Sequence, residues 1–102
     1  MVVTNEPGFY LKDQFGIRIE NVLVTLNEDS DKLRFENVTC VPYEVNLLDH
    51  KLISEDFKEF INNYHNQVYI LLKKLFNKLQ PLLLKQGDNI ALEYLKRKTA
   101  KI

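Results

Sequence analysis

Two runs near the start of the chain decide its fold: Thr4-Asn5-Glu6-Pro7-Gly8-Phe9-Tyr10 and Phe15-Gly16-Ile17-Arg18-Ile19-Glu20-Asn21. Proline and glycine end the first apolar run, because both residues interrupt strands. In the second run apolar and charged side chains alternate from Ile17 to Glu20, which places Arg18 and Glu20 on one face of a strand. The two runs therefore predict short strands that are separated by a connection.

The rest of the first half also has the pattern of strands and turns. The run from Val22 to Leu26 is apolar and suited to burial, whereas Asn27-Glu28-Asp29-Ser30-Asp31 has the composition of a polar turn. Proline at position 42 ends the last candidate strand. We therefore expect a strand from Val2 to the break at Pro7, a connection up to Gln14, and further strands from Phe15 to Leu26 and from Leu33 to Val41.

The second half has the periodicity of a helix. Ser54 is a candidate N-cap, and Glu55 and Asp56 follow in the first turn, where the helix dipole favours anions. Apolar residues then recur at the spacing of one helix face: Phe57, Phe60, Ile61, Tyr64, Val68, Leu71, Leu72, Leu75 and Leu79. The expected breaks after this stripe are Pro81 as an interruption, Gly87 as an end, and Asp88 as the cap of a last helix through about Lys98.

The composition is that of one small globular domain. The chain has 102 residues, of which 45% are hydrophobic and 27% are charged. Its 14 basic and 14 acidic residues cancel, which argues against a nucleic-acid-binding protein. No apolar segment is long enough to span a membrane, and the N-terminus lacks the pattern of a signal peptide. The single cysteine, Cys40, is expected to be a buried, inert thiol, which fits a cytoplasmic location.

Glu6 and Glu20 are the residues of the two runs that can carry chemistry. Two short antiparallel strands can place them side by side, close enough to share one partner. Carboxylate oxygens suit hard divalent cations such as Mn²⁺, Mg²⁺ or Ca²⁺, and a two-metal site needs several carboxylates. A pair of glutamates on a surface hairpin is more often simply solvated, so the spacing alone leaves both interpretations open.

The two runs resemble the end of the catalytic domain of aminopeptidase P, the Xaa-Pro aminopeptidase of the creatinase/prolidase-type pita-bread metallopeptidases. The similarity lies in Glu6-Pro7-Gly8 and in the run from Phe15 to Asn21, and it continues from Leu33 to Pro42. In the tail it extends over Leu47-Leu48-Asp49, Asn62-Asn63-Tyr64-His65, Ala91-Leu92-Glu93-Tyr94-Leu95 and Thr99-Ala100-Lys101-Ile102. This tail is similar to the C-terminal module of the large cytosolic type, which simple prolidases and methionine aminopeptidases lack.

The resemblance implies an α/β (α+β) fold, namely the C-terminal portion of a pita-bread fold. Antiparallel strands that carry the two glutamates would be followed by a helical C-terminal module. Residues 1–45 would form the end of the catalytic domain, and residues 46–102 would form the helical module.

The resemblance also implies a metal site. In this family two metal ions, typically Mn²⁺, are held by two Asp, one His and two Glu. Glu6 would bind one metal ion, Glu20 would bridge both, and a bridging hydroxide would attack the amide bond before proline. Arg18 would orient the carboxylates from the same strand face, or else form a plain surface ion pair. Tyr10 would line the site, or else be a packed aromatic residue.

The other ligands of the family, two Asp and one His, precede this segment. Candidates within the chain are expected at unsuitable places: Asp13, Asp29 and Asp31 in turns, and Asp49, Asp56 and Asp88 in the tail. His50 would lie on a connection, and His65 on the long helix, where we expect a structural role. We therefore expect a fragment of a dinuclear-metal enzyme that removes the N-terminal residue preceding proline, inactive in isolation because the upstream ligands are absent.

Two other interpretations remain open. The chain could be a stand-alone, non-enzymatic interaction or dimerisation module, because unpaired strand edges favour self-pairing. The parent could also be a catalytically inactive relative, such as the histone-chaperone branch of the fold, although both glutamates are retained. The expected partners are a proline-containing peptide substrate, the missing N-terminal part of the same enzyme and a second subunit in a homodimer, with no nucleic acid and no membrane.

Overall fold

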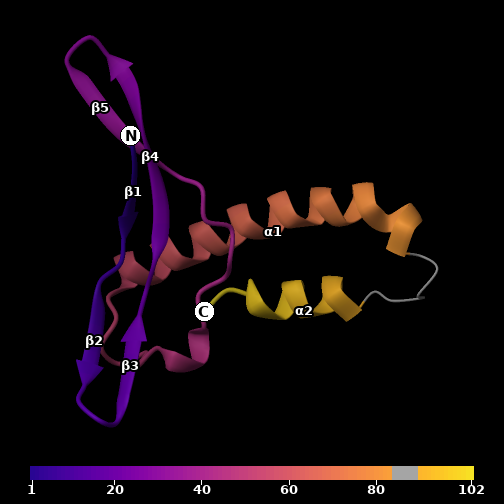
Figure 1. The fold of residues 1–102 in the computed structure, drawn as a ribbon. Helices are drawn as coiled ribbons and strands as arrows, with labels where there is room; N and C mark the ends of the chain where they lie inside the picture. The colour runs from indigo at the N-terminus through magenta and orange to yellow at the C-terminus, as the bar shows by residue number, and fades with distance from the viewer. Residues whose placement is uncertain (84–89) are drawn as a thin grey trace. The chain divides into compact units, whose positions relative to one another are not determined.

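The chain folds into two compact units, residues Met1–Thr39 and Cys40–Ile102. The computed structural model describes the backbone of residues 1–83 and 90–102, and the side chains of residues 1–79 and 90–102. Strands form the first unit and helices the second (Figure 1). The mixed α/β composition predicted from the sequence is therefore confirmed.

The first unit is built from antiparallel strands: β1 Val2–Asn5, β2 Gly8–Leu11, β3 Phe15–Arg18, β4 Asn21–Asp29 and β5 Lys32–Asn37. β4 lies between β1 and β5 in a three-stranded sheet, while β2 and β3 form a two-stranded ladder. Each strand pair is antiparallel, so opposing side chains on paired strands share one face of the layer.

The β1–β4 and β2–β3 ladders share one register. The pairs that flank the gap between the ladders are Asn5 with Asn21 and Gly8 with Arg18. The two segments that join the ladders therefore keep the same register through the gap. There the Ile19 N–H donates to the Pro7 carbonyl at 3.1 Å. An antiparallel pair of this kind normally exchanges two bonds. Pro7 has no N–H to give the second bond, which explains why the ladder is interrupted here.

Strand β2 differs from the prediction, which places a connection up to Gln14. β2 pairs with β3 through a short turn, in which the Gln14 N–H donates to the Leu11 carbonyl at 3.1 Å. Asp13 in this turn has a φ of 58°, a left-handed conformation that aspartate tolerates better than most residues. The turn therefore forms without the glycine that usually marks a hairpin. The structure also corrects the predicted long second strand, which is divided into β3 and β4.

β4 and β5 also end at other residues than predicted. β4 continues to Asp29 and takes in the first part of the predicted polar turn. β5 ends at Asn37, earlier than predicted, because the Thr39 hydroxyl replaces a backbone acceptor and accepts from the Val22 N–H at 2.8 Å. Cys40 therefore lies beyond the strand, and it is half-buried rather than fully buried.

The second unit consists of η1 Val45–Leu47, α1 Glu55–Leu83 and α2 Ile90–Lys98. Ser54 caps α1 as predicted, since its hydroxyl accepts from the Phe57 N–H at 3.2 Å. α1 continues through Pro81 to its end, which corrects the predicted interruption. A proline removes one backbone hydrogen bond, which is a small part of the hydrogen bonding of a helix of 29 residues. Gly87 and Asp88, the predicted helix end and cap, lie outside the described residues.

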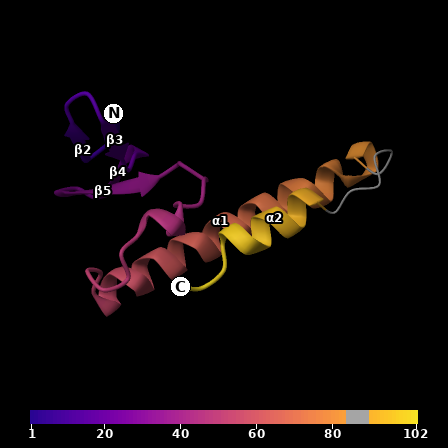
Figure 2. The same ribbon diagram turned by 90° about the horizontal axis from the view of Figure 1, so that it is seen from below.

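The core of the second unit lies between α1 and α2, which run side by side (Figures 1 and 2). Tyr64 and Val68 of α1 are buried with Leu95 of α2, and Ile61 and His65 are also buried. The predicted stripe of α1 is thus buried in its middle, while other members are 38% to 53% exposed: Phe57, Phe60, Leu71, Leu75 and Leu79. Neither helix, as far as it is described, is both long and apolar enough to cross a membrane.

Candidate metal centre

Glu6 and Glu20 lie opposite each other in the gap between the two ladders, because the shared register pairs them. The neighbouring pair, Pro7 with Ile19, is joined by a backbone hydrogen bond. Hydrogen-bonded and non-hydrogen-bonded pairs alternate along an antiparallel ladder. Glu6 and Glu20 therefore form a non-hydrogen-bonded pair, the type in which opposing Cα atoms approach to about 4.5 Å and side chains lie closest.

Tyr10 and Arg18 share the face of the two glutamates. Alternate side chains of a strand lie on one face, so Tyr10 follows Glu6 on that face and Arg18 precedes Glu20. The Arg18 Nη2 atom lies 3.1 Å from the Glu20 Oε2 atom. We call Glu6, Tyr10, Arg18 and Glu20 the glutamate face.

Arg18 is the centre of the polar contacts on the glutamate face. Hydrogen bonding to the Tyr10 hydroxyl, followed by the negative charges of Glu20 and Glu6, raises the pKa of the Arg18 guanidinium above its usual value. Arg18 therefore stays positively charged beside both carboxylates. Because both side chains of the Arg18–Glu20 pair are exposed to solvent, this pair adds little to stability.

The ring of Tyr10 rests against two glycines. A Cβ atom at Gly16 would lie 2.6 Å from the Tyr10 Cδ1 atom, and a Cβ atom at Gly8 would lie 2.6 Å from the Tyr10 hydroxyl oxygen. Both positions therefore need glycine for the ring to stay in place. From the sequence, Gly8 was interpreted only as a break after the first strand, and Gly16 was given no role. The available signal was glycine inside a strand-like run, which often marks the close approach of another group.

The glutamate face supplies two carboxylates as possible metal ligands, Glu6 and Glu20. Within residues 1–83 and 90–102, no group of three or more His, Cys, Asp or Glu side chains could hold a metal ion. The aspartates considered above are dispersed: Asp13 and Asp31 in turns, Asp29 at the end of β4, Asp49 before α1 and Asp56 in its first turn, with Asp88 outside the described residues. The glutamate oxygens fit a hard divalent cation, and a complete centre needs further ligands.

His65 has a structural role in the second unit. Its side chain is fully buried, and its Nε2 atom accepts from the Tyr43 N–H at 3.0 Å. Burial lowers the pKa of His65, because the imidazolium would lose its hydration. The neighbouring Tyr64 stacks on Tyr43 with 4.6 Å between ring centroids and donates to the Val41 carbonyl at 2.8 Å. His65 thus fastens the segment before η1 to α1, while His50 lies in an exposed turn.

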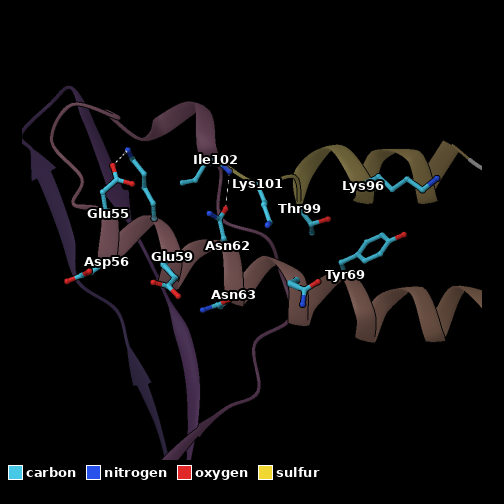
Figure 3. Close-up of a pocket in the computed structure, with 12 residues that line it drawn as sticks. Glu55, Asp56, Glu59, Asn62, Asn63, Tyr69, Lys96, Thr99, Lys101 and Ile102 are labelled. Carbon is cyan, nitrogen blue, oxygen red and sulfur yellow. Dashed lines mark hydrogen bonds and ion pairs between the residues drawn. The ribbon is translucent and has the colours of Figure 1, made fainter.

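The second unit also contains a polar groove of about 780 Å³ (Figure 3). The carboxylates of Glu55, Asp56 and Glu59 lie toward one end of the groove, and Lys96 lies toward the other. The Ile102 N–H donates to the Asn62 Oδ1 atom at 2.9 Å, which fastens the C-terminal segment to α1. None of the residues of the glutamate face lines this groove.

Comparison with known proteins assigns the family. Residues 31–102 match the C-terminal region of peptidase M24. The chain belongs to the peptidase M24 family, of which it matches the C-terminal region. This M24 match covers β5 and the whole second unit, and relatives extend the similarity over the strands that carry the glutamate face.

Two curated M24 relatives are each described as a probable Xaa-Pro aminopeptidase P. The relative from Pyrenophora teres f. teres is 46% identical over 97% of this chain, and that from Coprinopsis cinerea is 42% identical over 100% of it. The chain spans only 15% and 16% of the length of these relatives.

A solved structure extends the comparison. The X-prolyl aminopeptidase of Caenorhabditis elegans, described as a cytosolic enzyme with a di-nuclear active site, superposes with a TM-score of 0.70. It is 32% identical, and the match covers 99% of this chain and 16% of that chain. The M24 chain thus has the fold predicted for it, the C-terminal part of a pita-bread fold, and the resemblance to Xaa-Pro aminopeptidases is confirmed.

Proposed function

We propose that this M24 chain is the C-terminal part of a dinuclear-metal aminopeptidase that removes the N-terminal residue preceding proline from peptides. The observation that carries the proposal is the opposition of Glu6 and Glu20 on one face, with Arg18 paired to Glu20. The descriptions of the relatives as Xaa-Pro aminopeptidases and of the solved structure as di-nuclear support it.

Each residue of the glutamate face has a role in this proposal. Glu6 and Glu20 would hold the metal ions, while Arg18 holds Glu20 through its Oε2 atom. Tyr10 fixes Arg18 in turn through its hydroxyl group. Divalent ions, which we propose to be Mn²⁺, supply Lewis acidity for the peptide carbonyl and lower the pKa of a water molecule when they are bound.

The rest of the enzyme completes the proposed centre. Two carboxylates carry less negative charge than two divalent ions carry positive charge, so further anionic ligands are needed. Because the chain spans 15% and 16% of its relatives, the N-terminal part of the same enzyme can supply the two Asp and one His that the resemblance implies. In this division residues 1–45 end the catalytic domain and residues 46–102 form the helical module. The isolated chain is inactive for the same reason.

We further propose a cytoplasmic homodimer that acts on proline-containing peptides and binds neither nucleic acid nor membranes. The description of the Caenorhabditis elegans enzyme as cytosolic supports the location. The formal net charge of zero disfavours nucleic-acid binding, which normally needs a basic surface. The alternative, a stand-alone interaction or dimerisation module, is favoured by the large apolar side chains that stay exposed in the first unit.

A chimera tests the proposed function. In it, the Pyrenophora teres f. teres relative carries this chain in place of its own aligned segment. With Mn²⁺ the chimera is expected to hydrolyse an Xaa-Pro peptide, and Glu6→Gln and Glu20→Gln are each expected to abolish turnover and reduce the bound metal. Glu36→Gln is the matched control, because Glu36 is an exposed glutamate on the same side of the paired strands, and it is expected to keep full activity.

Three outcomes separate the alternatives. Full activity of both Glu6→Gln and Glu20→Gln would overturn the metal-ligand proposal. Turnover by the isolated chain that Glu20→Gln abolishes would refute the proposed inactivity of the fragment. A folded but inactive chimera, together with an isolated chain that forms a stable dimer, would favour the interaction module.

A further inference from the structure

The most buried residue of the first unit is an asparagine. Among residues 1–39, all of which the structure describes, Asn21 is the only buried one, at 9% exposure. It directly follows Glu20 and begins β4. Burying an amide group costs free energy unless new hydrogen bonds replace those that it makes with water. A buried amide in a unit whose apolar side chains all stay at least partly exposed therefore indicates a specific polar arrangement next to Glu20.

Asn21 belongs to a ring of hydrogen bonds that joins the start of β4 to the end of β5. The Asn21 Nδ2 atom donates to the Asn37 Oδ1 atom at 2.8 Å, and the Asn37 Nδ2 atom donates to the Thr39 carbonyl at 2.8 Å. The Val22 N–H, one residue after Asn21, donates to the Thr39 hydroxyl oxygen at 2.8 Å. We call Asn21, Asn37 and Thr39 the asparagine clamp. Because the ring closes through the backbone, its hydrogen bonds support one another and hold the start of β4 in one position.

The asparagine clamp lies where backbone pairing gives little support to Glu20. The β4–β5 ladder begins at Leu23 opposite Asn37, beyond Glu20 in the chain. On the side of β1, Pro7 has no N–H, so the pair that it forms with Ile19 has a single backbone hydrogen bond. Glu20 itself belongs to neither β3 nor β4. The clamp therefore adds a side-chain connection directly beside a glutamate that the regular ladders do not include.

We propose that Asn21 is a positioning residue for the proposed metal centre, because it holds the backbone from which the Glu20 carboxylate projects. This inference rests on the proposed function. Adjacent side chains of a strand project to opposite faces, so Asn21 points away from the glutamate face and does not touch a metal ion held there. Its effect reaches the carboxylate through the peptide bond between the two residues. Arg18 contacts the Glu20 carboxylate on its own face, whereas the clamp holds the backbone from the other face.

Asn21→Ala in the chimera tests this proposal. Half-maximal activity is expected to require about 10-fold more Mn²⁺, the lower end of the range for residues that orient metal ligands. The Mn²⁺ affinity, measured directly by titration calorimetry, is expected to fall by the same factor. Leu26→Ala is the matched control, because Leu26 is a half-buried residue further along β4, opposite Arg34. Its substitution weakens the same strand and is expected to leave both Mn²⁺ values unchanged.

A double-mutant cycle shows whether Asn21 acts through the asparagine clamp. Asn37→Ala removes the acceptor of the Asn21 amide and is expected to raise the Mn²⁺ requirement as well. The combined substitution should be no worse than Asn21→Ala alone, because each change breaks the same connection. Fully additive effects would overturn the proposed mechanism. If Asn21→Ala prevents folding, Thr39→Val removes only the hydroxyl group that accepts from the Val22 N–H, and an unchanged Mn²⁺ requirement in that variant would overturn the proposal.

Backbone dynamics of the metal-free chain give a readout that does not depend on activity. In NMR relaxation measurements, the Glu20 amide is expected to have a lower order parameter in Asn21→Ala than in the unsubstituted chain. The Leu26→Ala chain is expected to keep the order parameter of the unsubstituted chain at Glu20. Equal order parameters at Glu20 in all three chains would contradict the positioning role.

These measurements separate this inference from the proposed function. Full activity of both Glu6→Gln and Glu20→Gln would refute the metal site, and the order parameter at Glu20 would still report whether the clamp holds the backbone. A Glu20→Gln chimera that loses metal and activity, together with an Asn21→Ala chimera whose Mn²⁺ requirement is unchanged, would refute the positioning role alone.

Discussion

Glu6 and Glu20 oppose each other in one continuous register, although the strands that carry them are interrupted at that point. Like charges directly opposite each other on paired strands are destabilising. The positive charge of Arg18, whose guanidinium lies 3.1 Å from Glu20, compensates part of this repulsion. The opposition therefore costs stability in the isolated chain, and in the enzyme that we propose it would provide a pair of cation ligands.

Arg18→Gln is expected to lower activity and metal affinity in the chimera. Removing the guanidinium leaves the facing carboxylates without their counter-charge and frees the Glu20 carboxylate to rotate. Substitutions of residues that orient metal ligands typically cost about 10–100-fold in affinity or activity. We expect the activity and metal affinity of Arg18→Lys to lie between those of Arg18→Gln and those of the unsubstituted chimera. Lysine keeps the charge but lacks the planar guanidinium. The measurements are kcat/KM and the Mn²⁺ concentration that gives half-maximal activity.

Arg34→Gln provides the control for this prediction. Arg34 is an exposed arginine of β5 on the same side of the strands, and its substitution is expected to leave the Mn²⁺ requirement unchanged. An Arg18→Gln chimera with an unchanged Mn²⁺ requirement would show that Arg18 forms a plain surface ion pair.

Gly16→Ala is expected to destabilise the isolated chain by about 1 kcal/mol, because the added methyl group collides with the Tyr10 ring. Gly8→Ala is expected to cost less, since the new Cβ would meet the far end of the Tyr10 side chain, which can move aside. The measurement is the free energy of unfolding in urea.

A double-mutant cycle tests the cause of this effect. In a Tyr10→Ala background the collision is absent, and alanine in a strand is more favourable than glycine by roughly 0.5–1 kcal/mol. Gly16→Ala should then be neutral or stabilising. The same destabilisation in both backgrounds would mean that the glycine is required for another reason.

His65 is expected to make the helical unit less stable as the pH falls below about 6.5, the usual pKa of histidine. Burial lowers the pKa of His65 in the folded chain, so the unfolded chain binds more protons in this range. Stability that is present above the unfolded pKa is therefore lost as the pH falls toward the folded pKa. Protonation would also remove the lone pair of Nε2 that accepts from the Tyr43 N–H.

Urea unfolding at pH 7.5, 6.5 and 5.5, all within about one unit of that pKa, checks this prediction. His65→Gln should flatten the dependence on pH, even if it lowers stability at every pH. His50→Gln is the matched control, because His50 is exposed, and it should leave the dependence unchanged. If the stability of the wild-type chain did not decrease from pH 7.5 to pH 5.5, this would contradict the prediction.

Ile61→Val is expected to cost about 1 kcal/mol of unfolding free energy, because a buried methyl group is lost and a small cavity remains. Ile61 is 1% exposed. Ile70→Val in the same helix is the matched control at 47% exposure, and we expect a change within about 0.5 kcal/mol. Equal costs would show that the outer surface of α1 is also packed in the isolated chain.

Much of the local structure was predictable from the sequence. The N-cap at Ser54 and the helical stripe that contains Ile61 and Val68 depend on neighbours in the chain, so their patterns can be read directly. The ends of the elements were less predictable. The β2–β3 turn uses Asp13 in a conformation that the sequence does not mark, and β5 ends where the side chain of Thr39 replaces a backbone acceptor.

The candidate site also has features that the sequence predicted and features that it did not. Alternation alone placed Arg18 and Glu20 on one face, and the family resemblance directed attention to Glu6. The role of Gly16 was missed, because it comes from the Tyr10 ring on the opposing strand, and the role of Gly8 was missed because it depends on how that ring packs. The expected structural role of His65 agrees with its complete burial.

The sequence by itself determined the mixed fold class, the capped amphipathic helix and the grouping of alternating side chains, because each depends on residues close together in the chain. Only the tertiary structure decided that Glu6 opposes Glu20, that Tyr10 rests on two glycines, and which part of the α1 stripe is buried. The physical reason is register. A shift of one residue between paired strands would move every side chain to the other face, and no local pattern specifies that shift.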